Sequence, residues 1–200
     1  CIDISHNQGK NVVGSLVVFK NGAPSKKEYR LYNIQHSPGN NDYASMKETV
    51  YRRYRGLLSE NKTLPDLVII DGGKPQLNAA MKSIFELNIN KPPVLIGLAK
   101  KLESVFFYGV AEPLMIHKKS MSLRLLRRIR NEAHRFAINF HRDKSARSML
   151  SSELDNIEGI GNKSIDKLII KLGSIKKIKS ASFEELTLII GSHKAHIIYT

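Results

Sequence analysis

The sequence has 200 residues, of which 42% are hydrophobic and 25% charged, proportions typical of a folded globular chain rather than a disordered or collagen-like one. Lysine and arginine number 32 against 18 acidic residues, and the formal net charge of +14 favours nucleic acid over an anionic membrane surface as the partner. The single cysteine excludes an internal disulfide, and no stretch reaches the roughly 18 apolar residues of a membrane span. We therefore expect a cytoplasmic protein without a membrane partner. Because the chain opens with Cys1, we also expect it to be part of a longer protein.

The N-terminal part of the chain has a β-rich pattern that gives way to a helix. Strands are predicted for Ile2 to Ser5, Val12 to Phe19 and Tyr29 to Ile34, with Asn21-Gly22 as a hairpin turn. Apolar residues then recur at helical spacing from Asp42 to Arg55. The first part is therefore expected to form a hairpin followed by a helix.

Apolar strands and helices alternate in the middle of the chain. Asp66 to Asp71 is a short apolar run that ends in an acid before Gly72-Gly73, a pattern typical of a buried parallel strand that opens into a loop. A helix from Gln76 to Leu87, a strand from Val94 to Leu98 and a weak hairpin over 104–117 follow. The order predicts the α/β class, with a mixed sheet that carries helices on its faces.

The C-terminal part is predicted to be helical. Leu123 to Phe140 forms a strongly basic helix, and Lys144 to Ser152 is short and polar, which indicates a linker. We therefore expect two domains, 1–147 and 148–200.

The second domain is predicted to contain two helix–hairpin–helix units. The first consists of Leu154 to Ile157, Gly159-Ile160-Gly161 and Ile165 to Leu172, and a looser copy runs from Phe183 through Gly191 to Tyr199. Glycines before a helix let backbone N–H groups approach a phosphate closely. An ordinary helix-capping turn is the alternative interpretation.

Two carboxylates are candidates for metal binding. Asp3 lies in the first strand and Asp71 ends the central one, and consecutive strands can be neighbours in a mixed sheet. The pair could hold Mg²⁺ or Mn²⁺, which take oxygen ligands and can activate water against a phosphodiester. The alternative is that Asp3 is a solvent-exposed acid and that Asp71 caps the following helix.

The basic helix offers a histidine and a row of arginines. His134 is a candidate third ligand or general acid/base, or else a structural residue. The arginines form either a phosphate-facing surface or a solvated positive face; they are Arg124, Arg127, Arg128, Arg130, Arg135 and Arg142. Lys74 follows Gly72-Gly73 and could reach a phosphate, but the spacing of a nucleotide-binding loop is absent, which argues against ATP and against a phosphotransferase.

Five motifs in order give the chain a resemblance to a known family. They are Asp3-Ile4-Ser5-His6, Asp42-Tyr43-Ala44, Ile70-Asp71-Gly72-Gly73-Lys74, Gly97-Leu98-Ala99-Lys100 and the run from Ile129 to Ala137. The sequence resembles UvrC, the incision subunit of bacterial nucleotide excision repair. The resemblance implies an RNase H-like endonuclease domain followed by tandem helix-hairpin-helix motifs. It further implies Mg²⁺- or Mn²⁺-dependent cutting of damaged double-stranded DNA on the 5′ side of the lesion, within a UvrB–DNA complex.

The resemblance assigns roles to individual residues. Asp3 and Asp71 correspond to the metal-holding carboxylates, His134 to the third member of the active site, and Asp42 to a further acid, for which helix capping is the alternative. The expected DNA-binding residues are Lys74, Arg135, Gly159, Gly161, Lys163 and Gly191.

The sequence departs from the family pattern at two places. Asn131 stands where the family usually has aspartate, and Gly191-Ser192-His193 lacks the second glycine of the hairpin. The family's other nuclease and its main UvrB-binding segment are expected to lie outside these residues. A structure-selective DNA-binding module with a silent nuclease site is therefore the alternative to an active endonuclease.

Overall fold

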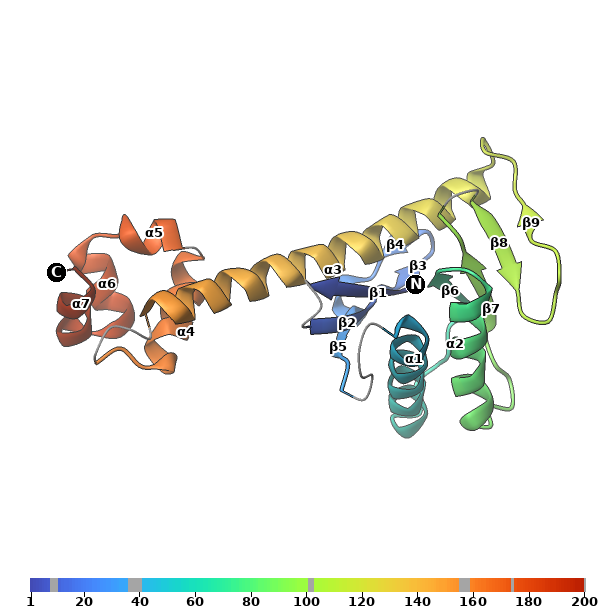
Figure 1. Cartoon of the computed structure of the whole chain (residues 1–200), viewed down its shortest axis with the longest axis horizontal. Helices are drawn as coiled ribbons and strands as arrows, with labels where there is room; N and C mark the ends of the chain where they lie inside the picture. Colours follow the sequence, from blue (N-terminus) through green and yellow to red (C-terminus); the bar gives the residue numbers. More distant parts are fainter. Residues whose placement is uncertain (8–10, 36–40, 101–102, 155–158, 174, 200) are drawn as a thin grey trace. The chain divides into compact units, whose positions relative to one another are not determined.

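The computed structural model describes residues 1–7, 11–35, 41–100, 103–154, 159–173 and 175–199. The chain divides into two compact units, Cys1–Ile138 and Asn139–Thr200, and each is described by itself. Figure 1 labels the elements of both. The boundary precedes the predicted division between residues 147 and 148.

A seven-stranded mixed sheet forms the centre of the first unit, in the order β5-β2-β1-β6-β7-β8-β9. The strands are β1 (Ile2–Asn7), β2 (Asn11–Leu16), β5 (Arg30–Asn33), β6 (Leu67–Asp71), β7 (Val94–Leu98), β8 (Ser104–Phe107) and β9 (Leu114–Met115). The pairs β1–β6 and β6–β7 are parallel, and the other pairs are antiparallel. The predicted α/β class with a mixed sheet is confirmed.

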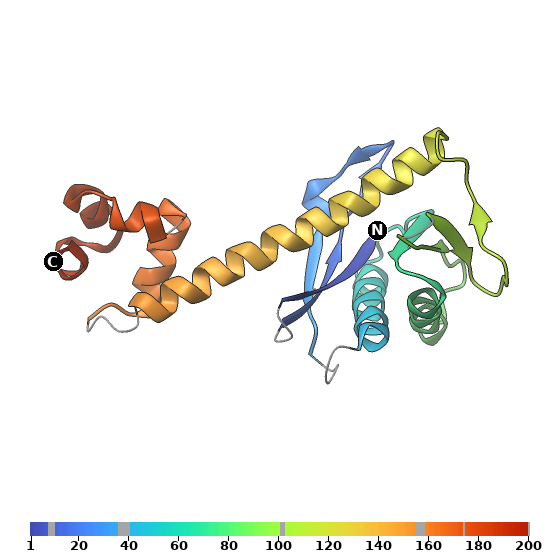
Figure 2. The same cartoon turned by 45° about the horizontal axis from the view of Figure 1, so that its top comes forward.

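Helices cover both faces of this sheet (Figure 2). The helices α1 (Asp42–Ser59) and α2 (Lys74–Glu86) pack on one face, where Ile2 and Ile70 belong to the same buried cluster as Met46 and Leu77. The first half of α3 (Met121–Leu154) crosses the opposite face. Because strand residues alternate between faces, neighbours of Ile2 and Ile70 point toward α3.

The Asn-Gly dipeptide forms the turn that the sequence predicts. Asn21 and Gly22 both have positive φ, 51° and 73°, as a two-residue type I′ hairpin requires. The turn joins β3 (Phe19–Lys20) and β4 (Ala23–Pro24) in a separate two-stranded sheet. A 3₁₀ helix η1 (Lys26–Glu28) leads into β5, which pairs with β2.

The predicted linker from Lys144 to Ser152 is wrong, because α3 continues as a helix to Leu154. Its polar composition suggested a linker, but Lys, Arg, Ala, Met and Leu all favour helix and no glycine or proline interrupts the run. The predicted short helix from Leu154 to Ile157 falls mostly on residues 155–158, which lie outside the described residues.

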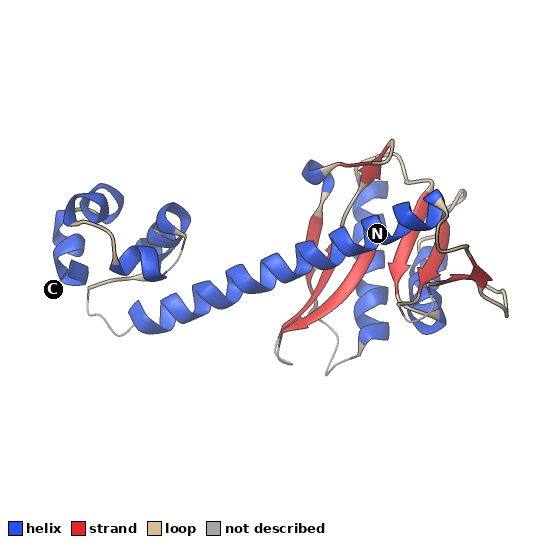
Figure 3. Cartoon of the chain, turned by 90° about the horizontal axis from the view of Figure 1, so that it is seen from above, coloured by secondary structure: helices blue, strands red, loops and turns tan. Residues whose placement is uncertain are grey.

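The described part of the second unit is helical (Figure 3). It contains the end of α3, α4 (Asn162–Leu172), α5 (Ile175–Lys179), α6 (Phe183–Ile190) and α7 (Ser192–Tyr199). Its core includes Ile160, Ile165 and Leu168 from the first predicted hairpin unit together with Leu186 and Ala195 from the second. Across the described residues of both units, no helix combines the length and apolar character that a membrane crossing requires.

Candidate active site

Asp3 and Asp71 lie side by side in the sheet. The parallel strands β1 and β6 place Ile2 opposite Ile70, so the next residue of each strand is also a neighbour of the other. Ile2 and Ile70 are buried against α1 and α2, and the two aspartates therefore point to the face covered by α3. The adjacency that the sequence predicts for these two acids is present in the structure.

Both carboxylates are largely removed from solvent. The side chain of Asp3 is 6% exposed and that of Asp71 is 3% exposed. Burial, followed by the charge of Asp71, raises the pKa of Asp3 to about 6, while the hydrogen bond from His134 acts in the opposite direction. Two adjacent acids in a buried position form an electrostatically unfavourable pair that a cation would stabilise. Such perturbed groups are concentrated at functional sites.

His134 approaches this pair from α3. Its Nδ1 lies 3.3 Å from Asp3 Oδ2, and its side chain is half exposed at 49%. The neighbouring Ala133 is fully buried against the sheet, and the absence of a larger side chain lets the helix backbone come close. Ser15, which lies opposite Asp3 in β2, donates a hydrogen bond of 3.1 Å to the Ala133 carbonyl. The imidazole is thus held at the edge of the carboxylate pair, with one side open to solvent.

Asp71 carries the second feature that bears on metal binding. Its Oδ2 is buried and has no hydrogen-bond partner among the described residues, although the ammonium of Lys100 lies 3.7 Å away. A buried carboxylate oxygen without a donor is costly, and a cation would satisfy it. The donor set of two adjacent carboxylates fits Mg²⁺ or Mn²⁺, which usually keep water among their ligands.

The protein ligands alone do not form a closed metal cage. Within the described residues, no group of three or more His, Cys, Asp or Glu side chains is arranged so that it could hold a metal ion. His134 instead contacts Asp3 through a hydrogen bond of 3.3 Å. Mg²⁺ is typically bound by one or two carboxylates plus water and substrate oxygens, and Asp3 and Asp71 supply that number of carboxylates.

Glu103 connects the segment after β7 to α3. Its two carboxylate oxygens accept hydrogen bonds of 3.1 and 3.2 Å from Arg130, and Arg127 lies 3.5 Å away. Arg130 was expected on the outer face of the basic helix, but it is buried. Its helical spacing from Leu126 and Ala133 places it on the inward stripe of α3. This ion pair joins Glu103 to the inward stripe of α3.

Asp42 lies apart from the carboxylate pair. It opens α1, and its Oδ1 lies 2.5 Å from Nε2 of His6. His6 lies three positions after Asp3 in β1, and an odd offset along a strand places two side chains on opposite faces. The capping role considered for Asp42 is wrong, because Asn41 is the N-cap and accepts from the Ala44 N–H.

The remaining candidate residues of the first unit engage neighbouring groups. The ammonium of Lys74 donates to the carbonyl of Ala111 and lies 5.8 Å from the centre of the Phe106 ring. The guanidinium of Arg135 donates two hydrogen bonds of 2.7 Å to Glu132. Both cations are therefore held near the surface without being drawn to Asp3 or Asp71.

A shallow surface hollow runs along α3. Its lining consists of Arg124, Arg127, Arg128, Asn131, Glu132 and Arg135. Asn131, where the family usually has aspartate, is exposed in this arginine-rich lining. The amide therefore makes this hollow more positive than an aspartate would, which favours an anionic ligand.

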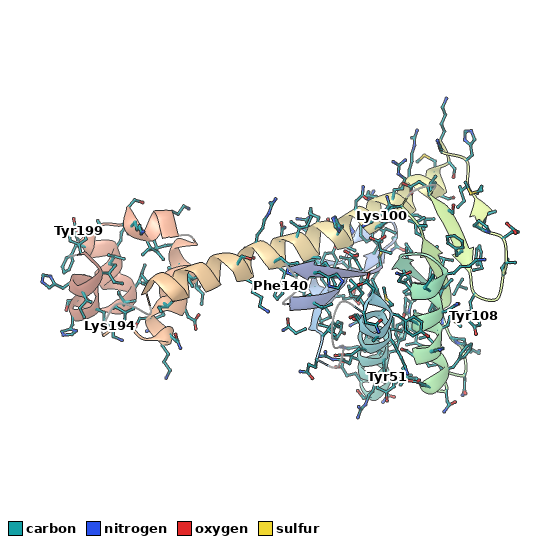
Figure 4. The ribbon with its side chains drawn as sticks, in the orientation of Figure 1. Tyr51, Lys100, Tyr108, Phe140, Lys194 and Tyr199 are labelled. Carbon is teal, nitrogen blue, oxygen red and sulfur yellow. The ribbon has the colours of Figure 1, made fainter. Side chains whose placement is uncertain are left out.

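The hairpin glycines of the second unit occupy two different backbone states. Gly161 precedes α4 in an extended conformation, with φ −93° and ψ 164°, whereas Gly159 and Gly191 have φ of 94° and 85°. Lys163 is exposed in the first turn of α4. Lys194 of α7, labelled in Figure 4, donates a 2.9 Å hydrogen bond to Ser164 and so links the two predicted hairpin units.

The sequence pattern assigns no role to three residues that contact the aspartates or the helix α3: Ser15, Lys100 and Glu103. Lys100 belongs to the motif Gly97-Leu98-Ala99-Lys100. A charged residue at the end of an apolar strand, as Asp71 also is, indicates a position at the same edge of the sheet as Asp71. Ser15 could be placed only through the β1–β2 register, which the sequence does not specify. Glu103 gave no signal, because its partner Arg130 looked like one of many surface arginines.

Comparisons with known proteins bear on the family and the fold of the chain. Residues 1–138 match the family described as the UvrC RNAse H endonuclease domain, so the mixed sheet with its helices has the expected RNase H-like fold. The chain is similar to UvrABC system protein C of Christiangramia forsetii, with 48% identity over 99% of this chain and 33% of that protein. It is also similar to the proteins of the same name from Flavobacterium psychrophilum, with 50% identity over 98% of this chain and 33% of that protein, and Cytophaga hutchinsonii, with 47% identity over 100% and 34%. The chain spans about a third of the length of these curated relatives.

Proposed function

The chain belongs to the UvrC family, and on this premise we propose that it is a metal-dependent DNA endonuclease that makes the 5′ incision in damaged DNA during nucleotide excision repair. The observation that carries the proposal is the buried pair of Asp3 and Asp71 beside His134, with one carboxylate oxygen left without a hydrogen-bond partner among the described residues. Mg²⁺ or Mn²⁺ is the proposed cofactor.

Asp3 and Asp71 would hold the metal through their carboxylate oxygens. Bound there, the ion would lower the pKa of a coordinated water and offset negative charge on the phosphodiester. His134, which is half exposed and contacts Asp3, either completes the ligand set or moves a proton at Nδ1. Burial of both carboxylates keeps water from screening their charge. Asp42 pairs with His6, and any contribution that it makes to cutting is made without contact to the group of Asp3, Asp71 and His134.

The basic residues are proposed to bind the DNA backbone. The arginine-lined hollow of α3 and Lys74 would receive phosphates beside the carboxylates, and the hairpin residues Gly159, Gly161, Lys163 and Gly191 would receive them in the second unit. Phosphate contacts position a protein on DNA without reading its sequence. We therefore propose that specificity comes from DNA shape and from a UvrB–DNA complex. A cytoplasmic location is part of the same proposal.

Cutting of a bubble-containing duplex with Mn²⁺ tests the proposal through Asp71→Asn. We expect this change to reduce cutting by about 10²-fold or more, as the loss of a group that stabilises transition-state charge does. DNA affinity should be preserved, because removing a negative charge near phosphates does not weaken binding.

Asp66→Asn is the matched control. Asp66 is exposed and lies just before the same strand, β6, and the substitution removes the same charge. It should cut like the wild-type protein. Equal background cutting by the wild-type protein and Asp71→Asn would instead favour the DNA-binding module with a silent site.

A further inference from the structure

Lys100 lies at the rim of the carboxylate pair and has no assigned role. Its Nζ is 3.7 Å from the buried Oδ2 of Asp71, while its side chain is 64% exposed. That separation is longer than a hydrogen bond, and only the carboxylate of the pair is buried, so the ammonium keeps its contact with solvent. The ammonium is therefore close to Asp71 without being fixed to it by a hydrogen bond.

The backbone that carries Lys100 is well anchored. The N–H of Gly72 donates to the Leu98 carbonyl at 3.3 Å, and the N–H of Ala99 donates to the Ser104 carbonyl at 3.1 Å. Gly97 is equally constrained, since a Cβ there would lie 3.0 Å from the carbonyl oxygen of Gly72. The start of the lysine side chain is thus fixed relative to Asp71, and its four-carbon stem gives the charge a short range of movement.

Other basic side chains around the site have structural partners. Lys74 donates to Ala111, Arg130 pairs with Glu103, and Arg135 pairs with Glu132. Within the described part of the chain, Lys100 is the basic residue that forms an ion contact with Asp71. It is therefore the cation best placed to act where Asp71 acts.

We propose that Lys100 is a catalytic residue whose ammonium binds a non-bridging oxygen of the phosphate being cut. The inference rests on the proposed endonuclease function. A phosphodiester that approaches two carboxylates is repelled by them, and a positive charge at their rim offsets this repulsion. With a cation held by the carboxylates, Lys100 would be released from Asp71 by charge repulsion and would be free to bind the phosphate.

The chemical step gives Lys100 an electrostatic role only. The oxygen of a water molecule forms a bond to phosphorus as the bond from phosphorus to the leaving sugar oxygen breaks. The proton that the water loses is balanced by the proton that the leaving oxygen gains. Lys100 neither gives nor takes a proton, and its charge stabilises the negative charge on the phosphoryl oxygens in the transition state.

The test compares Lys100→Met, which keeps the length of the stem without its charge, with Lys100→Arg. Lys62→Met is the matched control. Lys62 pairs with Glu60 on an exposed surface, and the substitution removes the same charge. Three quantities are measured: the single-turnover rate of cutting a bubble duplex, the DNA affinity at fixed salt, and the Mn²⁺ affinity by calorimetry without DNA.

We expect Lys100→Met to slow cutting about 10²-fold, and Lys100→Arg to recover part of the rate because it restores the charge. DNA affinity should change by less than about threefold, since a single phosphate contact contributes little to binding. Mn²⁺ should bind Lys100→Met at least as tightly as the wild-type protein, because a repelling charge is removed. Lys62→Met should resemble the wild-type protein in all three measurements.

Two results would overturn the role of Lys100 while the proposed function stands. One is cutting by Lys100→Met at the wild-type rate while Asp71→Asn is inactive. The other is weaker Mn²⁺ binding by Lys100→Met, which would mean that Lys100 only orders the carboxylates. Equal background from the wild-type protein and Asp71→Asn would reject the endonuclease function itself, and the role of Lys100 with it.

Discussion

The hydroxyl of Ser15 in β2 donates a 3.1 Å hydrogen bond to the carbonyl of Ala133 in α3, and this contact ties the strand beside Asp3 to the helix that carries His134. Ser15 is fully buried and pairs with Asp3 across the β1–β2 ladder. The distance between the Asp3 carboxylate and the His134 imidazole therefore depends on the Ser15–Ala133 hydrogen bond, in which neither of these two side chains takes part. Ser15 is a positioning residue in this arrangement.

Replacing Ser15 with alanine should reduce the free energy of unfolding by about 1 kcal/mol, the usual net contribution of one hydrogen bond. Cutting should fall by about tenfold, since small displacements of reacting groups are costly in rate. Ser83→Ala is the matched control: Ser83 is also fully buried and donates to a helix carbonyl, that of Lys47, on the α1–α2 face. Urea unfolding and nicking rates should show similar stability losses but slow cutting for Ser15→Ala alone. Equal slowing by both variants would reduce Ser15 to a structural role.

The raised pKa of Asp3 predicts an unusual pH dependence for the metal-free protein. The folded state holds the Asp3 proton up to a pKa of about 6, whereas the ordinary value is 3.8. Between these values the folded state binds more protons than the unfolded one, so the contribution of Asp3 to stability falls as pH rises. The loss is complete above pH 6 and amounts to at most about 3 kcal/mol.

Asp3→Asn isolates this effect, because it keeps the shape of the side chain without the charge. With a chelator present, the variant should be more stable than the wild-type protein at pH 7.5, and the difference should shrink toward pH 4. Urea unfolding at several pH values between 4 and 7.5 measures it. A difference that is constant across this range would contradict the buried charge at Asp3.

Some of this site follows from the sequence, because short-range rules determine it. Asp71 ends an apolar run that predicts a buried strand, and the strand period turns Asp3 and Asp71 to one face once β1 and β6 pair. The alternation of side chains along β1 places His6 on the opposite face from Asp3. Asp42, which contacts His6, therefore lies on that opposite face as well. These features need only the strand period and strand order.

Other parts of the site depend on long-range contacts that no local pattern specifies. The Ser15–Ala133 bond joins residues 118 positions apart and requires both a strand register and the rotation of α3. The Arg130–Glu103 pair requires the same rotation. The linker prediction is wrong for a different reason: the polarity of Lys144 to Ser152 favours a linker, whereas its Lys, Arg, Ala, Met and Leu residues favour the helix that is present.

Removing Glu103 should be strongly destabilising. Arg130 is buried and receives its two carboxylate contacts from this residue, and an unpaired buried charge costs about 3 kcal/mol or more. We expect Glu103→Ala to lose about that much stability in urea unfolding, and the double variant with Arg130→Met to recover part of it. Glu60→Ala, which breaks the exposed pair with Lys62, should change stability by less than about 1 kcal/mol. Similar losses in Glu103→Ala and Glu60→Ala would mean that Arg130 is solvated.

Substitutions at the two glycines of the first hairpin unit, Gly159 and Gly161, distinguish an effect on folding from an effect on DNA binding. A Cβ at Gly161 would meet no heavy atom within 4 Å, and its extended backbone suits any residue, so Gly161→Ala should lose less than about 1 kcal/mol, the cost of alanine at the N-cap of α4. A Cβ at Gly159 would lie 3.0 Å from Ile197 Cδ1, at a φ of 94°. Gly159→Ala should therefore lose about 1 to 2 kcal/mol through strain alone.

If the backbone at Gly161 receives a phosphate, an added methyl group obstructs the approach, because close contact is what glycine permits at such sites. Gly161→Ala should then bind a bubble duplex several-fold more weakly while its thermal unfolding changes little. Fluorescence anisotropy at several salt concentrations measures the affinity, and the weaker binding should be accompanied by a shallower salt dependence as one phosphate contact is lost. Wild-type affinity and an unchanged salt slope in Gly161→Ala would show that Gly161 serves only to start α4, and that the phosphates are held elsewhere in the basic surface.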